Sequence, residues 1–436
     1  MRQTLFTIDH FLFENYWILI AWLVFGLAFL GFQMFRGKTG DAWSFTPVYV
    51  VGAVLILFVF PRLEMPGINS ADPNGPLVPD GLAIRGYGLC LLLAMTIGFG
   101  LVLYRCRQIG LDGDKMLSLC FWMVVVGLIG ARLFYVIQKF DSFSDLGPRE
   151  LLLKMVDMTS GGLVVYGSLI GGVIAIVVFL YIQKLPWRTV VDVLAPGMII
   201  GLAIGRIGCL MNGCCYGGVC DAELPGIFFP AGSAPYVDQL RSGELLGVEG
   251  TLDEKTSLVT VESVIKNSVA EESGVKAGDQ IRIYLTHQQM DDPMLRLRAA
   301  KNGFDQMKVN AVIDVDEGPA VFVPPAQLPD HSLKTHPTQI YSAINAGLLC
   351  AFLWFYFPYR RNTGEVFAWL LILYPIGRFV LEIIRQDELG QFGTGFTISQ
   401  WVSFGVLVGG TALMAYVRIV PQSPQDVEIF AGAVEK

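Results

Sequence analysis

Charged residues are scarce in this sequence. Only 16% of its 436 residues are Asp, Glu, Lys or Arg, compared with about 25% in ordinary soluble domains. Hydrophobic residues make up 53%, and the mean hydropathy is +0.54. A protein with this small share of charged residues cannot cover a surface that faces water throughout. The composition therefore excludes an ordinary soluble protein. It predicts an all-α polytopic membrane protein.

An excess of basic residues is also missing. Lys and Arg number 31 against 38 Asp and Glu, which gives a net charge of -7. No basic cluster with interleaved aromatic residues occurs along the chain. Because binding to nucleic acid depends on a positively charged surface, we exclude a nucleic-acid partner.

Apolar runs long enough to cross a bilayer recur along the chain. A span needs about 20 mostly apolar residues. The first run lacks the short charged start and small-residue cleavage site of a signal peptide, so we expect it to be retained. We predict about nine spans, the second of them short, at residues 16–35, 45–60, 82–104, 116–137, 162–182, 190–211, 340–357, 366–384 and 398–417.

Basic residues in the short loops predict the orientation. Lys and Arg concentrate in cytoplasmic loops, and here they fall in alternate loops: Arg36, Lys38, Arg105, Arg107, Lys115, Lys184, Arg188, Arg360 and Arg361. This pattern predicts an N-terminus outside the cell and a cytoplasmic tail at residues 418–436.

Residues 218–332 differ in character from the rest of the chain. They are polar and contain no run long enough to span a membrane, so we predict a folded extracytoplasmic insertion. Residues 258–284 predict a strand, a short helix at 270–273, a turn at Gly278 and Asp279, and a second strand. This order resembles the centre of an α/β PDZ domain, similar to those of periplasmic proteases. Such domains bind extended peptides, and a structural spacer is the alternative reading.

The sixth predicted span ends in an unusual motif, GRIGCLMNGCCYGGVCD, at residues 205–221. Arg206 either contributes to function, since a charge at the edge of a span is energetically costly, or extends to the lipid headgroups. The cysteine spacing, C-x4-C-C-x4-C, is not typical of zinc-ribbon or ferredoxin sites, so we predict no metal. Facing an oxidising compartment, the cysteines favour one or two disulfides, with reduced packing residues or a redox role as alternatives. These cysteines are Cys209, Cys214, Cys215 and Cys220.

The other four cysteines lie in or beside apolar runs. Free cysteine is among the most buried residue types, so we interpret them as packing residues. They are Cys90, Cys106, Cys120 and Cys350.

Polar residues collect at the predicted outer ends of the spans. Arginine matches phosphate oxygens with two parallel hydrogen bonds, so three arginines there predict an anionic lipid headgroup as ligand. Arg378 and Glu382 share a helix face. They form either a structural ion pair or a pair in which Glu382 positions Arg378 for a phosphate. The glycine-rich run at 161–172 favours close helix packing, or else lets a lipid tail approach Tyr166.

Several sequence blocks follow one another in a specific order: YG at 87–88, GARLFYVI at 130–137, GGLVVYGSLIGG at 161–172, GRIG at 205–208 with NG and YG after it, HPTQIYSA at 336–343 and GRFVLEIIRQ at 377–386. Together they resemble the successive blocks of the prolipoprotein diacylglyceryl transferase family. The resemblance covers residues 82–417 apart from the insertion. It implies seven of the nine spans, leaving the first two and the insertion as additions.

The resemblance implies an enzyme that moves the diacylglyceryl group of phosphatidylglycerol to the lipobox cysteine of a prolipoprotein, forming a thioether and releasing glycerol phosphate. It implies no cofactor, and it places the active site toward the outer leaflet of the bacterial inner membrane. One alternative is a non-catalytic receptor or assembly factor that binds anionic phospholipid and peptide. A weaker one is a membrane thiol oxidoreductase.

The resemblance also assigns roles to residues. It implies catalytic roles for Arg206, Arg378 and Tyr87, and we add Tyr166, at the position of the family's histidine, as a further catalytic candidate. Arg206 would bind the phosphate of phosphatidylglycerol, and the remaining substrate contacts would come from Arg132, Asn212, Gly217, His336, Gln339, Tyr341, Glu382 and Arg385.

Three positions depart from the family pattern. Cys209 stands where the family has asparagine, Cys214 where it has glutamate, and Tyr166 where it has histidine, the natural base near neutral pH. Three readings of proton removal therefore stay open. Tyr166 acts as base beside the arginines, His336 takes the proton, or the positive field alone deprotonates the acceptor thiol.

The predicted organisation has five parts. They are two extra N-terminal helices with an outer loop at 1–81, a membrane core at 82–217, the insertion at 218–332, the rest of the core at 333–417, and the tail at 418–436.

Overall fold

The structure is a computed structural model of the chain. It describes residues 4–8, 16–35, 53, 65–67, 78–140, 147, 154–155, 162–220, 223–253, 256–287, 309–315, 321–324, 326–385, 393–422 and 426. The second predicted span, residues 45–60, lies almost entirely outside the described residues.

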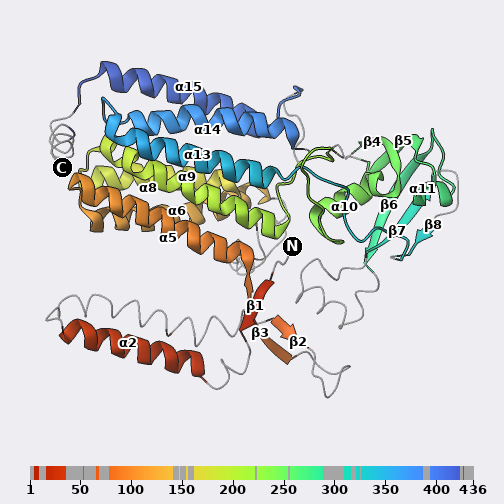
Figure 1. The fold of residues 1–436 in the computed structure, drawn as a ribbon, viewed down its shortest axis with the longest axis horizontal. Helices are drawn as coiled ribbons and strands as arrows, with labels where there is room; N and C mark the ends of the chain where they lie inside the picture. Colours follow the sequence, from red (N-terminus) through yellow and green to blue (C-terminus); the bar gives the residue numbers. More distant parts are fainter. Residues whose placement is uncertain are drawn as a thin grey trace. The chain divides into compact units, whose positions relative to one another are not determined.

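Seven of the described helices are long and apolar enough to cross a membrane. They confirm seven of the predicted spans and run alongside one another (Figure 1). They are α5 (Gly86–Ile109), α6 (Gly113–Gln138), α8 (Val165–Gln183), α9 (Trp187–Asn212), α13 (Thr338–Tyr356), α14 (Glu365–Ile384) and α15 (Ile398–Ile419). The first predicted run also forms a helix, α2 (Trp17–Phe35), of which Trp17–Ala28 counts as a shorter apolar helix.

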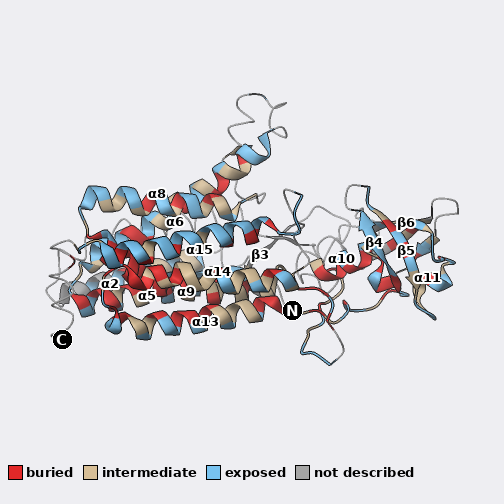
Figure 2. Cartoon of the chain, turned by 90° about the horizontal axis from the view of Figure 1, so that it is seen from above, coloured by how far each residue is buried: buried red, intermediate tan, exposed pale blue. Residues whose placement is uncertain are grey.

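The chain divides into two compact units. The helical unit comprises residues 91–205, 341–383 and 388–436, and the sheet unit comprises residues 1–90, 206–340 and 384–387. α9 begins in the first and ends in the second. It is the most buried candidate span, with 44% of its most apolar window buried, against 22–28% in the other six. Figure 2 shows the same contrast between α9 and the more exposed α8 and α15.

The core of the helical unit confirms the packing role predicted for three cysteines. Cys106, Cys120 and Cys350 are buried in one apolar cluster with residues such as Met116 and Leu353. Cys90, which belongs to the sheet unit, is also buried. Many large apolar side chains on the outer faces of the helices are exposed instead, as expected for surfaces that contact lipid.

Glycines allow α6 and α8 to pack backbone to backbone. A Cβ added at Gly130 would lie 2.4 Å from the carbonyl oxygen of Gly167, and one at Gly171 would lie 2.4 Å from that of Val126. Small residues at such crossings are the usual device in membrane helices. The close-packing reading of the glycine-rich run is therefore confirmed.

A buried charge network holds α9 to the segment that leads into α14. Asp192 is fully buried and accepts hydrogen bonds from the backbone N–H groups of Gly364 at 2.7 Å and Phe367 at 2.9 Å. The Arg360 Nε lies 3.5 Å from its carboxylate. The carboxylate thereby gains the partners that a buried charge requires.

The insertion forms a five-stranded antiparallel sheet, ordered β4-β5-β6-β7-β8. The strands are β4 (Val248–Asp253), β5 (Leu258–Val264), β6 (Gln280–His287), β7 (Val309–Val315) and β8 (Val321–Val323). α11 (Val269–Glu272) follows β5, so the predicted order of strand, short helix, turn and strand is confirmed. α10 (Ala234–Arg241) contributes Tyr236 and Leu240 to the core of this sheet.

A second sheet near the N-terminus was not predicted. It has the order β1-β3-β2 and consists of β1 (Thr4–Ile8), β2 (Met65–Gly67) and β3 (Val78–Arg85). The prediction for residues 1–81 contained only helices and a loop, so it was incomplete. β3 ends at Arg85, and α5 begins at the next residue, Gly86.

The close approach of α6 and α8 can be tested at one glycine pair. Gly171→Ala should destabilise the protein by roughly 1–3 kcal/mol, because the new methyl group meets the Val126 carbonyl. Gly172→Ala is the matched control, since nothing lies within 4 Å of its Cβ position. Thermal unfolding in detergent measures both variants. Equal midpoints for the two variants would contradict the packing described.

Candidate functional site

The end of α9 folds back on itself. Gly213 has φ +73°, and its N–H bonds the carbonyl of Leu210 at 3.3 Å. The N–H of Cys214 bonds the carbonyl of Cys209 at 3.1 Å, and Cys215 has φ +60°, an uncommon conformation for a residue with a side chain. This turn returns the chain toward the last turn of the helix.

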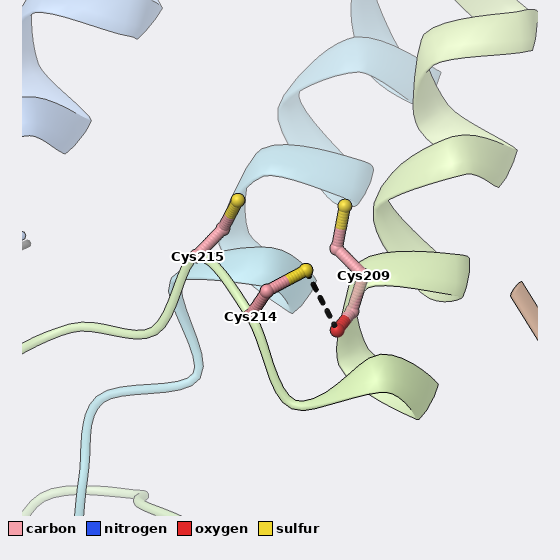
Figure 3. A group of neighbouring side chains, drawn as sticks. All are labelled: Cys209, Cys214 and Cys215. Atoms are coloured by element: carbon pink, nitrogen blue, oxygen red, sulfur yellow. Dashed lines mark hydrogen bonds between the residues drawn. The ribbon is translucent and has the colours of Figure 1, made fainter. Parts of the chain in front are cut away.

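The turn gathers three thiols. The sulfur atoms of Cys209, Cys214 and Cys215 all lie within 4.8 Å of one another (Figure 3). Cys214 Sγ is 3.7 Å from the carbonyl oxygen of Cys209, and the Asn212 amide lies 3.6 Å from Cys214 Sγ. All eight cysteines are free thiols in this structure. Cys220 is buried and is not part of the three-sulfur group. Pairing of these cysteines as disulfides stays a prediction.

Hydrogen bonds from the HPTQ segment anchor the turn. Thr338 Oγ1 donates to the carbonyl of Cys215, and Gln339 Nε2 donates to that of Cys214, each at 2.7 Å. Both side chains are almost completely buried. Thr338 was not singled out from the sequence, although its place in the HPTQ block was a usable signal.

Backbone pairing adds three more predicted residues to this assembly. The N–H of Gly217 donates to the carbonyl of His336 at 3.0 Å, and the N–H of His336 donates to that of Gly218 at 3.0 Å. Gly217 also forms a bridge with Arg385. A Cβ at Gly217 would lie 2.7 Å from the Cβ of His336, so this pairing requires glycine.

Arg206 lies one helical turn before Cys209. It is half-buried, and within the described part of the chain its Nε is a buried donor without a hydrogen-bond partner. Hydrogen bonds from Cys209 and Cys214 lower the pKa of the Cys215 thiol, and the positive charges of Arg206 and Arg385 lower it further. The arrangement is an electropositive site with an unfilled guanidinium donor. Such a site suits an anion.

Tyr87 lies beside this motif. It stands in the first turn of α5, and a Cβ at Gly208 would lie 3.1 Å from its ring. Gly86 packs more closely against Met211, since its Cβ would lie 2.5 Å from Met211 Cε. The side chain of Tyr87 interacts electrostatically with Arg206 and the three clustered cysteines. The structure therefore brings Tyr87 and Arg206 into one site.

The helical unit contains the predicted pair of an arginine and a glutamate on one helix face. Arg378 and Glu382 form an ion pair, as their spacing predicted. Arg378 Nη2 donates to Ser399 Oγ at 3.0 Å, and Thr397 Oγ1 donates to Glu382 Oε1 at 3.1 Å. Ser399 and Thr397 belong to the start of α15 and were not predicted. Glu382 is buried, so its charge requires these partners.

Arg132 serves the local structure of the helical unit. It is buried, and its guanidinium donates to the backbone carbonyls of Met155, Gly162 and Lys154 at 3.0, 3.1 and 2.6 Å. A substrate-binding role for Arg132 stays a prediction. Tyr166, half-buried in the first turn of α8, and Tyr341 in α13 also lie in this unit.

Comparisons with known proteins found a matching family model and similar proteins. A family model described as prolipoprotein diacylglyceryl transferase matches residues 77–416. A protein of Rhodopirellula baltica named phosphatidylglycerol–prolipoprotein diacylglyceryl transferase is 36% identical over 452 residues, covering 96% of this chain and 89% of the relative. A Clostridium perfringens protein with that name and the number 2 is 24% identical over 333 residues, covering 76% and 91%.

The need for glycine at position 217 is testable. Gly217→Ala should open the pairing with His336 and speed amide hydrogen exchange around residues 217 and 336 by about tenfold or more, since overpacking costs roughly 1–3 kcal/mol. Gly205→Ala is the control, because nothing lies within 4 Å of its Cβ position. Exchange measured by mass spectrometry that is the same in both variants would refute the requirement.

Proposed function

The chain belongs to the prolipoprotein diacylglyceryl transferase family, and we propose from this premise how its residues carry out the transfer. It is a multi-pass membrane enzyme that transfers a diacylglyceryl group from phosphatidylglycerol to a prolipoprotein. The observation that carries the site assignment is the buried Arg206 Nε, a donor left without a partner among the described residues.

We propose that the acceptor is the thiol of the lipobox cysteine. The thiolate is the form of cysteine that attacks. Its sulfur bonds to the glycerol carbon that carries the phosphate, and the carbon–oxygen bond to the phosphate breaks. The oxygen leaves with the bonding electrons as part of glycerol phosphate, and the thiol proton passes to a base.

Arg206 binds the phosphate of the lipid in this proposal. Negative charge builds on the phosphate oxygens as the bond breaks, so a guanidinium aimed at them binds the transition state better than the substrate. We also propose Arg378 as an arginine that acts on the phospholipid. Glu382 and Ser399 hold its guanidinium in one orientation. Such pre-positioning is how residues beside a site support catalysis.

We propose His336 as the base. A neutral imidazole accepts a proton near neutral pH, which an ordinary tyrosine does poorly. His336 pairs through its backbone with Gly217 and Gly218, which lie in the same motif as Arg206 and the thiols. Tyr87, beside Gly208, orients the bound groups.

The remaining features extend this proposal to the membrane. The loop charges support an N-terminus outside the bacterial inner membrane, a cytoplasmic tail, a site toward the outer leaflet and nine spans. The insertion serves as a PDZ-like peptide-binding domain. β4 is one of the two edge strands of its sheet and is exposed beyond Val248. An open edge strand is the element that pairs with an extended peptide.

Removing the guanidinium of Arg206 tests the phosphate assignment. Arg206→Ala should lower kcat/KM for transfer from labelled phosphatidylglycerol to a lipobox peptide by about 10²–10³, the range for one lost transition-state donor. Arg206→Lys should also lose activity, because an ammonium cannot form two parallel hydrogen bonds. Arg107→Ala is the control, because Arg107 is an exposed arginine in the last turn of α5. A normal rate in Arg206→Ala would overturn the assignment.

The pH profile of transfer tests the base. An imidazolium cannot accept a proton, so a histidine base makes the rate fall as the pH falls. His336→Asn should be slow and should lose this acidic limb, whereas Tyr166→Phe should keep it. If Tyr166→Phe removes the limb and His336→Asn keeps it, the base is Tyr166. If the rate still falls at acidic pH in both variants, the positive field of the arginines deprotonates the acceptor thiol.

Removing the sheet of the insertion tests peptide capture. A Gly-Ser linker in place of residues 245–325 deletes β4 to β8 and keeps α10, whose Gln239 bonds Thr335 and Leu333. Transfer to a short lipobox peptide should continue, while transfer to a full-length prolipoprotein should slow. The short peptide is the internal control for folding. Equal use of the full-length substrate by both proteins would rule out the capture role.

A further inference from the structure

The transfer reaction leaves the three clustered thiols without a role. Their sulfur atoms converge within 4.8 Å although they come from different turns of the chain (Figure 3). Cys209 belongs to the last turn of α9, and Cys214 and Cys215 follow the bend at Gly213. A disulfide would use two of these sulfurs. Convergence of all three gives a geometry that could hold a metal ion.

The backbone that carries the three cysteines is held by bonds that do not involve the thiols. Thr338 and Gln339 bond the carbonyls of Cys215 and Cys214, and the N–H of Cys214 bonds the carbonyl of Cys209. The positive φ of Cys215 is the kind of strained backbone that collects at ligand sites. The frame is therefore built before any ligand arrives.

We propose that Cys209, Cys214 and Cys215 bind one thiophilic metal ion of the Zn²⁺ or Cu⁺ class. Soft thiolate ligands select these ions over the harder Mg²⁺ and Ca²⁺. With metal–sulfur bonds of about 2.3 Å, three sulfurs around one ion lie about 3.8–4.0 Å apart. The observed separations reach that range through side-chain movements of about 1 Å or less.

Access and charge also fit a metal ion. All three cysteines are half-buried rather than sealed, so an ion can reach them. Three thiolates around Zn²⁺ leave a net negative charge. Arg206 and Arg385, which interact electrostatically with Cys215, offset it. From the spacing along the sequence we predicted no metal, because it matches neither the zinc-ribbon nor the ferredoxin pattern.

Direct metal titration tests the proposal without using lipid transfer, so its outcome is separate from that of the proposed function. Full-length protein in detergent is first treated with chelator and reductant, which removes bound metal and reduces the thiols. Both reagents are then removed under anaerobic conditions. The protein is titrated with Co²⁺ as a spectroscopic probe. One equivalent should give a thiolate-to-cobalt charge-transfer band that Zn²⁺ removes. A parallel titration of Cu⁺ against a coloured Cu⁺ chelator decides which ion binds more tightly.

Variants assign the ligands. Cys209→Ala, Cys214→Ala and Cys215→Ala should each weaken binding at least about 100-fold, the upper end of what the loss of supporting residues around a metal costs. Cys120→Ala, which removes a buried thiol outside the group, should bind as the natural protein does. Binding that persists in all three cluster variants, or no stoichiometric binding in the natural protein, would overturn the proposal.

X-ray absorption spectroscopy of the zinc-loaded natural protein counts the sulfur neighbours of the metal directly. It does not depend on whether the variants fold. Three sulfur neighbours at about 2.3 Å would support the site. Fewer than three would overturn it. So would peptide mapping that finds two of the three cysteines joined as a disulfide in protein that binds no metal after reduction.

Discussion

The buried Nε of Arg206, which has no hydrogen-bond partner among the described residues, constrains the structure around the end of α9. Removing the Nε of Arg206 from water without a partner is unfavourable, so the surrounding fold must supply stability from elsewhere. It does so through the Gly217–His336 pairing and the side-chain bonds of Thr338 and Gln339. A positively charged group is thereby held at the end of the most buried of the seven candidate spans.

Hydropathy and periodicity predicted the spans and the pattern of the insertion because both signals are local. The seven helices follow from apolar runs, and residues 258–284 carry their own strand and turn signals. The N-terminal sheet could not be found in this way. β1 pairs with β3, with Thr4 opposite Arg85, across a long stretch of intervening chain, and nothing in the five residues of β1 specifies that partner.

The site shows a similar division. The type and spacing of Arg378 and Glu382 predicted their ion pair, since residues four apart share a helix face. The meeting of Cys209 with Cys214 and Cys215 depends on a left-handed turn that no ligand-spacing rule describes. Arg132 matched a family block, yet three backbone carbonyls occupy its guanidinium. The sequence pattern identified Arg132 as a candidate, but it could not show which groups its side chain contacts.

The two ends of the insertion lie backbone to backbone. The backbone N–H of Cys220 donates to the carbonyl of Lys334, and that of Ile227 donates to the carbonyl of Thr335. Pro230 and His331 form a β-bridge. Lengthening a loop whose ends are already held together adds little entropic cost, because closure entropy grows only slowly with length. A long insertion at this junction therefore adds little to the entropy cost of folding the membrane part of the chain.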